Sequence, residues 1–269
     1  MDGFESVKLF KQLPALTLPL GLALGAVFIQ IAWPLTAGDT RVFVTTLSVA
    51  VLWLSSVSHL VRSASLPRAV AVTVLVGVIG LTVEIIGSGT GLLFGEYDYT
   101  GILQPTIAEV PLAVIMAWFM MSWPIFVLTE RALRNKSVGI RTVAGAALMT
   151  SWDLFLDPQM VGENYWRWTD NGSALPGIPG IPISNYAWWF IVSCLVMLVL
   201  RLTRITTPTE LATPLVVVGW TWFGGVVAHG IFWGNFGAAL WGGFTMGGLL
   251  YFLLWNHRLV HTEVGYETR

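Results

Sequence analysis

Long apolar segments dominate the chain, and most of them are about as long as a membrane helix. Crossing the hydrocarbon core of a bilayer takes roughly 20 predominantly apolar residues. Eight segments approach that length: residues 14–36, 42–61, 69–87, 106–129, 139–156, 185–203, 211–233 and 236–256. The sequence therefore predicts an all-α integral membrane protein, a bundle of about eight transmembrane helices that forms a single polytopic domain over residues 1–269.

Composition excludes several soluble classes. Only 11% of the residues are charged, against about a quarter in a typical soluble domain. A net charge of −1 without a basic run excludes nucleic-acid binding, and the single cysteine, Cys194, excludes an internal disulfide. The first apolar run, Leu13 to Trp33, is too long for the apolar region of a signal peptide, so we expect a membrane helix there.

The basic residues predict the orientation of the bundle. With the N-terminus inside, twelve of the fourteen Lys and Arg residues fall in inner segments, and Arg41 and Arg167 fall outside. The twelve are Lys8, Lys11, Arg62, Arg68, Arg131, Arg134, Lys136, Arg141, Arg201, Arg204, Arg258 and Arg269. By the positive-inside rule, we expect a multi-pass protein of the cell membrane with both termini in the cytoplasm.

Two long outer connections, residues 87–105 and 151–186, are rich in aromatic residues and glycine. Neither has the composition of a solvated loop, so we expect both to pack into or over the bundle. The same outer half collects ionisable residues: Glu84 near the end of the third helix, Glu109 at the start of the fourth, Asp153 and Asp157 at the end of the fifth, and His229 in the seventh. Ionisable residues at membrane depth are usually functional or paired.

Asp153 and Asp157 are the strongest candidates for chemistry. Their four-residue spacing places both on one helical face, and Pro158 predicts that the helix ends at Asp157. Two carboxylates this close do not both ionise easily near the membrane boundary, which leaves a carboxylic acid for general acid catalysis. We expect Asp153 to be the donor because it lies deeper in the apolar span.

Structural interpretations remain open for several of these residues. The aspartate pair could be a hydrated helix end, Glu84 could bond a neighbouring helix, and Glu96 and Asp98 could be turn residues. We expect His229 to pack or to bond between helices, because no second His or Cys lies at the spacing of a metal site.

The tryptophans divide by position. Near helix ends, Trp33, Trp188, Trp189, Trp233 and Trp255 predict an interfacial belt. Near mid-span, Trp53, Trp118, Trp220 and Trp222 are expected to fill the core or to line a channel for a flat apolar ligand. Trp166 and Trp168 alternate in a loop and favour a site. The glycines of residues 241–248 predict close helix packing.

Other membrane classes fit poorly. A rhodopsin-like receptor needs a lysine inside a late helix, but the three lysines are all on the inner side. A UbiA-type prenyltransferase shares the D-x-x-x-D spacing, yet it also needs a second acidic motif and basic residues beside it, and here only Arg167 is near. A transporter or channel would show internal symmetry or broken helices in matching halves, and we find neither.

A combination of motifs resembles a known family. The motifs are Phe94-Gly-x-Tyr97-x-Tyr99, Asp153-x-x-x-Asp157-Pro158, Trp166-x-Trp168, and residues 180–186 followed by Trp189. Together they resemble the membrane carotenoid-biosynthesis protein family, which includes carotenoid 1',2'-hydratases and the bisanhydrobacterioruberin hydratase of haloarchaea. The resemblance extends from about Gly87 to the last helix.

The resemblance implies a carotenoid hydratase, a carbon–oxygen lyase that adds water to the terminal double bond of an acyclic carotenoid and yields a tertiary alcohol. One Asp would protonate the alkene, aromatic faces would hold the cation at about 0.5–2 kcal/mol each, and water would capture it. No cofactor or metal is implied. The expected partners are a lycopene- or bisanhydrobacterioruberin-like carotenoid and the lipid membrane, with other carotenoid-biosynthesis enzymes as candidates.

The resulting site prediction has two parts. The catalytic candidates are Asp153, Asp157, Glu84 and Glu96. The substrate-binding candidates are Tyr97, Tyr99, Trp152, Trp166, Trp168, Asn185, Trp189 and His229. Two alternatives stay open: a carotenoid cyclase, which shares the protonation step, and a carotenoid-binding or transport protein without turnover.

Overall fold

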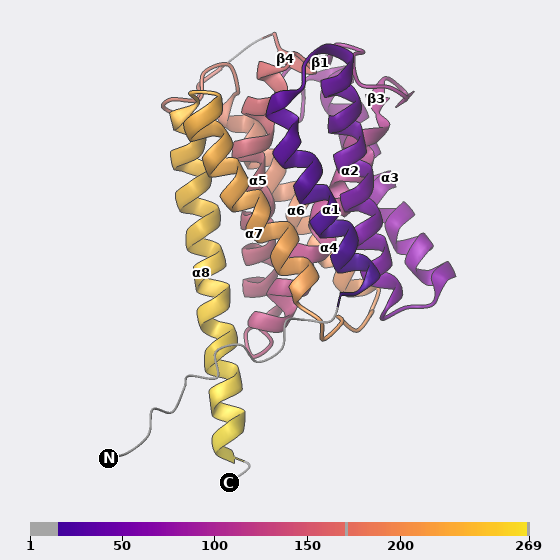
Figure 1. Cartoon of the computed structure of the whole chain (residues 1–269), viewed down its shortest axis with the longest axis vertical. Helices are drawn as coiled ribbons and strands as arrows, with labels where there is room; N and C mark the ends of the chain where they lie inside the picture. Colours follow the sequence, from indigo (N-terminus) through magenta and orange to yellow (C-terminus); the bar gives the residue numbers. More distant parts are fainter. Residues whose placement is uncertain (1–15, 170–171, 268–269) are drawn as a thin grey trace.

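The computed structural model describes residues 16–169 and 172–267, and these form a bundle of helices capped at one end by short strands (Figure 1). The helices are α1 (Leu18–Ala32), α2 (Gly38–Val61), α3 (Leu66–Thr90), α4 (Leu112–Ala132), α5 (Val138–Gly162), α6 (Ile183–Leu202), α7 (Ala212–Val227) and α8 (Phe236–Glu267). A 3₁₀ turn, η1 (Trp33–Leu35), extends α1, and a π-helical turn, η2 (Ala228–Phe232), extends α7. The strands are β1 (Tyr97–Tyr99), β2 (Thr106–Ile107), β3 (Val110–Pro111) and β4 (Trp166–Trp168).

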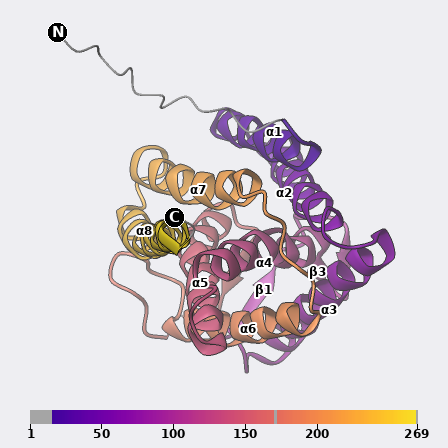
Figure 2. The same ribbon diagram turned by 90° about the horizontal axis from the view of Figure 1, so that it is seen from below.

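The expected all-α membrane architecture is confirmed. Within the described residues, seven of the eight helices are long and apolar enough to cross a membrane, and α5 is the exception. Helix α4 is central, since it contacts α2, α3, α5, α6, α7 and α8, and it is the most buried of the seven. Viewed along the bundle, α4 lies at the centre and α5 stands between α8 and α6 (Figure 2).

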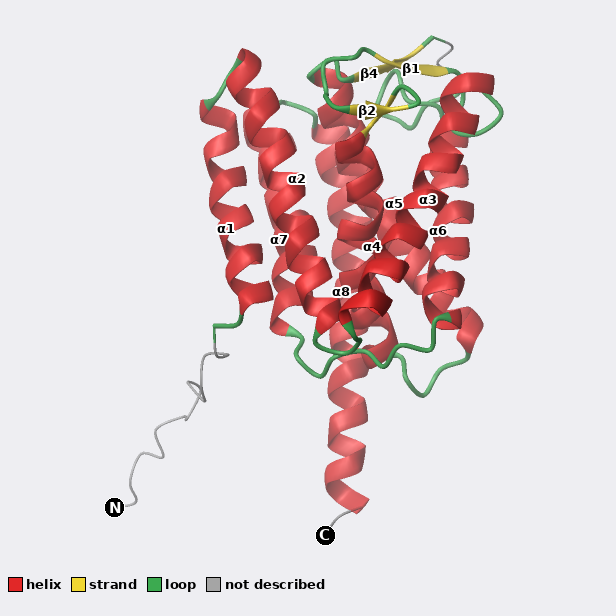
Figure 3. Cartoon of the chain, turned by 90° about the vertical axis from the view of Figure 1, so that its right-hand side faces the viewer, coloured by secondary structure: helices red, strands yellow, loops and turns green. Residues whose placement is uncertain are grey.

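The connections divide between two ends of the bundle (Figure 3). One end, called the sheet end here, carries the strands and residues 33–37, 91–111, 163–169, 172–182 and 233–235. The opposite end carries residues 62–65, 133–137 and 203–211, which hold Arg62, Arg134, Lys136 and Arg204. This separation agrees with the predicted alternation of helices, while the assignment of the sheet end to the outside stays a prediction. Lys8, Lys11 and Arg269 lie outside the described residues.

The start of the fourth helix was predicted wrongly. Residues 106–111 form the β2–β3 hairpin, and α4 begins only at Leu112. Val110 precedes a proline, which disfavours helical geometry, and Pro111 then takes the position before the first helical residue. Glu109 therefore lies in the hairpin turn, with a positive φ of 69°, and does not open the helix.

The end of the fifth helix was also predicted wrongly. Helix α5 continues through Pro158 to Gly162, so Asp157 is inside the helix. A proline in a helix removes one backbone donor, and in membrane bundles groups from neighbouring helices satisfy backbone atoms near such breaks. Here Nε2 of His229 lies 2.9 Å from the carbonyl oxygen of Phe155, three residues before the proline. The interhelical hydrogen bond expected of His229 is therefore present.

The two long connections pair with each other above the bundle. Strands β1 and β4 are antiparallel, with Tyr97 opposite Trp168 and Tyr99 opposite Trp166. Because side chains alternate across a strand, these four aromatic rings share the inner face, and Asp98 and Arg167 share the exposed face. The β1–β4 sheet thus places an aromatic surface against the helices below it.

Candidate functional site

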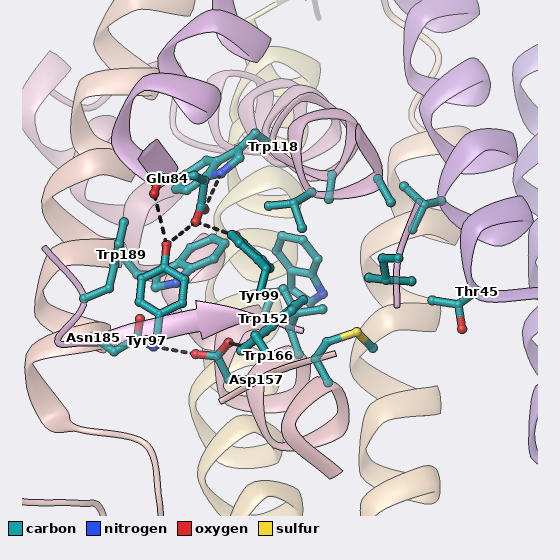
Figure 4. A pocket seen from close by; sticks show the side chains of 18 of the residues that line it. Thr45, Glu84, Tyr97, Tyr99, Trp118, Trp152, Asp157, Trp166, Asn185 and Trp189 are labelled. Atoms are coloured by element: carbon teal, nitrogen blue, oxygen red, sulfur yellow. Dashed lines mark hydrogen bonds between the residues drawn. The ribbon is translucent and has the colours of Figure 1, made fainter. Parts of the chain in front are cut away.

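A cavity lies beneath the β1–β4 sheet, between α2, α3, α4, α5 and α6 (Figure 4). It is lined by Thr45, Val49, Glu84, Phe94, Tyr97, Tyr99, Leu103, Ala113, Val114, Ala117, Trp118, Trp152, Leu156, Asp157, Met160, Trp166, Trp168, Asn185 and Trp189. The space between its atoms, including the part open to solvent at its mouth, is about 640 Å³. Its wall is mostly apolar, so the two carboxyl groups on it stand out. We call it the carboxyl cavity.

Glu84 is the first of these carboxyl groups, and it is held by three donors. Oε2 accepts hydrogen bonds from the hydroxyls of Tyr97 at 2.6 Å and Tyr99 at 2.7 Å. Oε1 accepts one from Nε1 of Trp118 at 3.0 Å. With the side chain buried at 5% exposure, this satisfied carboxyl group is fixed in position and joins the sheet to α3 and α4.

A close approach of α3 and α4 makes this arrangement possible. A Cβ atom on Gly80 would lie 2.4 Å from Cδ1 of Trp118, so a larger residue would displace the indole ring. About two turns further along α3, a Cβ on Gly87 would lie 2.8 Å from the ring of Phe94. Two small positions on α3 therefore admit the rings that surround Glu84.

Tyr97 and Tyr99 are donors that stay protonated. Burial and the adjacent Glu84 carboxyl group raise the pKa of both phenols well above its ordinary value. Ionisation would place a negative charge beside the Glu84 carboxyl group in an apolar site, which is unfavourable. The two hydroxyls therefore remain hydrogen-bond donors to Glu84 throughout the neutral range.

Asp157 and Asp153 form the second acidic group. The side-chain amide of Asn185 bridges them, with Nδ2 at 2.5 Å from Oδ2 of Asp157 and 2.8 Å from Oδ2 of Asp153. Nε1 of Trp166 donates to Oδ1 of Asp157 at 3.1 Å. The two carboxyl groups also lie within hydrogen-bonding reach of each other. The predicted pairing of the aspartates on one helical face is present, and both are buried in the bundle rather than hydrated.

Only one aspartate faces the carboxyl cavity. Asp157 is part of its wall, whereas Asp153 is fully buried behind it. Oδ1 of Asp153 and the hydroxyl of Tyr186 are buried without a donor or acceptor from the described residues. The deeper position that favoured Asp153 as proton donor therefore keeps it off the cavity wall, and Asp157 is the aspartate that lines the cavity.

Tryptophan rings form the rest of the wall. Trp118 and Trp189 stack with ring centroids 4.4 Å apart at 11°, and Trp152 meets Trp189 edge to face at 5.8 Å. Trp189 and Trp33 are buried at 8% and 4% exposure, so the interfacial belt predicted for them is wrong. Trp168 lies on the same wall and donates through Nε1 to the carbonyl oxygen of Phe94 at 2.9 Å.

Some predicted residues lie elsewhere. Glu96 and Asp98 are exposed on the far side of the β1–β4 sheet and do not reach the carboxyl cavity. His229 lies on the opposite side of Phe155 and lines a neighbouring cavity instead. Trp118 was considered only as a core or channel residue, yet it contacts both Glu84 and Trp189. In the sequence, the feature that could have indicated a site role for Trp118 was its position near the middle of an apolar segment.

The described residues contain no group of three or more His, Cys, Asp or Glu side chains arranged to hold a metal ion. The polar groups on the cavity wall are carboxyl, amide, hydroxyl and indole N–H groups. Such groups can donate, accept and transfer protons to a ligand. The surrounding aromatic faces can stabilise a positive charge that develops between them.

Comparison with known proteins identifies the family of the chain. A family model described as carotenoid biosynthesis protein matches residues 40–252, a range that contains every residue on the wall of the carboxyl cavity. No curated protein matches the chain, and no solved structure does. Because the match covers well over half of the sequence, the chain belongs to the carotenoid biosynthesis protein family.

Proposed function

We propose that the protein is a carotenoid hydratase that adds water to the terminal double bond of an acyclic carotenoid. The observation that carries this proposal is the position of Asp157, a carboxyl group paired with Asp153 and facing an apolar cavity walled by tryptophan rings. Protonating an alkene requires a carboxylic acid shielded from water, and a tertiary cation requires an apolar, π-rich surrounding.

The two acidic groups would have different roles. Asp153 and Asp157 would both be protonated before the reaction, since two adjacent buried carboxylates do not both ionise easily, and Asp157 delivers its proton to the less substituted alkene carbon. Asp153 keeps its own proton, so only one of the pair becomes ionised, and the Asn185 amide continues to donate to both. Glu84, which accepts hydrogen bonds from three donors, would as a carboxylate provide the negative charge opposite the cation.

The remaining steps balance the reaction. Protonation turns the double bond into a tertiary cation held between the rings of Trp118, Trp152 and Trp189. The oxygen of one water molecule bonds to the cationic carbon, and the oxonium proton returns to a carboxylate of the site. The product is the substrate plus one water, a tertiary alcohol, and each carboxyl group is restored.

Expression in a lycopene-accumulating host tests the proposal. Mass analysis of the pigments should show a gain of one water per reacted end, and the Asp157→Asn variant should show none. The exposed residue Asp98 offers a matched control, because Asp98→Asn makes the same chemical change outside the cavity. A product with the mass of lycopene and a changed absorption spectrum would instead indicate the cyclase, and unchanged pigment bound to the purified protein would indicate a carotenoid-binding role.

A further inference from the structure

A second cavity adjoins the carboxyl cavity and lies between α1, α2, α4, α5 and α7. The two cavities share six wall residues, Thr45, Val49, Ala117, Trp152, Leu156 and Met160. Three of the six, Thr45 and Val49 on α2 and Ala117 on α4, have short side chains. At these positions no large ring lies between the two cavities. We call this second space the side chamber; it encloses about 970 Å³ not filled by atoms, including its mouth.

The side chamber has the chemistry of a site for a long hydrocarbon. None of the described residues on its wall is Asp, Glu, Lys or Arg. Trp220 forms part of the wall and is held by a hydrogen bond from Nε1 to Oε1 of Gln30 at 2.7 Å. Beside it, Gly224 allows the Trp220 ring to pack closely against α7, since a Cβ there would lie only 3.2 Å from that ring. At the sheet end, Trp33 and Trp233 pack edge to face at 5.2 Å.

The shape of the carboxyl cavity leaves few directions for the rest of a long substrate. The β1–β4 sheet covers it at one end, and the stacked rings of Trp118 and Trp189 stand on the α4 and α6 side. A rigid polyene with its terminal double bond beside Asp157 can continue past Trp152 and Leu156, which belong to both cavities. That direction leads into the side chamber.

We propose that the side chamber binds the polyene chain of the carotenoid while its terminal double bond lies in the carboxyl cavity. This inference rests on the proposed function, because that function places the reacting end at Asp157. It adds a length requirement: a full-length carotenoid needs the side chamber, whereas a short isoprenoid with the same end group needs only the carboxyl cavity.

Variants that fill the side chamber from opposite walls provide the test. Ser48→Phe acts from α2, and Gly224→Phe acts from α7. Each has a matched control on its own helix. Ser58 makes the same bond to the carbonyl three residues earlier as Ser48 does, and Gly219 has open space around its Cβ position. Neither Ser58 nor Gly219 belongs to the wall of either cavity.

The probes are lycopene and farnesene, which carries the same terminal double bond on a short chain. Ser48→Phe and Gly224→Phe should hydrate lycopene about tenfold more slowly or worse and still hydrate farnesene, while Ser58→Phe and Gly219→Phe hydrate both. Both filled variants hydrating lycopene at the normal rate would overturn the inference, as would an equal loss of both substrates.

Binding separates this inference from the proposed function. If the unaltered protein hydrates neither probe, the hydratase proposal fails, and retention of lycopene by the purified protein then tests the side chamber. The unaltered protein and the two controls should retain the pigment, and the filled variants should release it. Equal retention by all five proteins would exclude the chamber as the polyene site.

Discussion

Asn185 donates its side-chain amide to Asp157 across 2.5 Å, and the same nitrogen reaches Asp153 at 2.8 Å. One amide group therefore uses both of its N–H bonds on two carboxyl groups, which fixes their spacing. Trp166 adds a donor to Asp157 only. Asp157 therefore accepts from two side-chain donors and Asp153 from one. Asp157 is also the aspartate on the wall of the carboxyl cavity.

The first prediction follows from that asymmetry. Asp→Asn keeps size and hydrogen bonding but removes the transferable proton. General acid catalysis typically contributes about 10²–10⁴-fold, so Asp157→Asn should lose at least that much turnover. Asp153→Asn should be impaired less, because it removes the partner and leaves the cavity-facing acid. Turnover is measured per molecule of membrane-inserted protein, with Asp98→Asn as control. If both variants keep near-normal rates, the pair is structural.

A second prediction concerns Asn185. Asn185→Leu has a similar volume but leaves two buried carboxyl groups without their shared donor, and an unsatisfied buried polar group costs about 1–3 kcal/mol. We expect a lower midpoint of thermal unfolding and a loss of turnover together. Asn185→Gln, which keeps the amide, should lose less stability than Asn185→Leu. A Leu variant that is stable and active would mean that the amide does not hold the pair.

A third prediction separates the two tryptophans of β4. Trp166→Phe keeps an aromatic ring but removes the N–H that reaches Asp157, so turnover should fall about tenfold with little change in protein yield. Trp168→Phe removes the bond to the Phe94 carbonyl, so it should lower yield and stability more than turnover. Specific activity and membrane yield, measured for both variants, give the comparison. The opposite pattern would make Trp168 the residue that acts on the acid.

The fourth prediction tests orientation. In a Cys194→Ala background, a cysteine at Ser173, on the sheet end, should react with an impermeant reagent added outside the cell. A cysteine at Ser137, between α4 and α5, should react only after the membrane is opened. Both positions are exposed in the structure, so accessibility does not bias the result. The reverse pattern would place the carboxyl cavity at the cytoplasmic face.

The sequence predicted the helices well because each apolar run is long and each end is marked by basic or aromatic residues. It predicted that Glu84, Asp153 and Asp157 would gather at one end, since helix alternation alone brings those positions together. It could not predict the pairing of β1 with β4, because that pairing joins residues about seventy positions apart through three-residue strands. Without it, neither the three donors to Glu84 nor the role of Trp166 could be assigned.

The errors have a physical cause as well. The local rule for the residue before a proline was applied at Pro158 and not at Pro111, and that rule holds where the backbone has no other partner. At Pro111 the rule holds and the helix starts later, whereas at Pro158 packing in the bundle outweighed it. The hydrogen bond between His229 and Phe155 is a contact between α5 and η2, and local sequence does not reveal which helices are neighbours.

The last prediction concerns the charge of Glu84. In Glu84→Gln, the amide oxygen can face Trp118 and the amide nitrogen can face the hydroxyl oxygens of Tyr97 and Tyr99, which accept as well as donate. The local structure should therefore survive while the negative charge is lost. Removing one electrostatic contact to a developing charge typically costs about 10²–10³-fold in rate, so we expect a loss of that size at normal yield. Tyr99→Phe, which removes one donor and keeps the charge, should cost less. Normal turnover in Glu84→Gln would show that Glu84 only anchors the sheet to α3, and Asp157 would then act without an opposing charge.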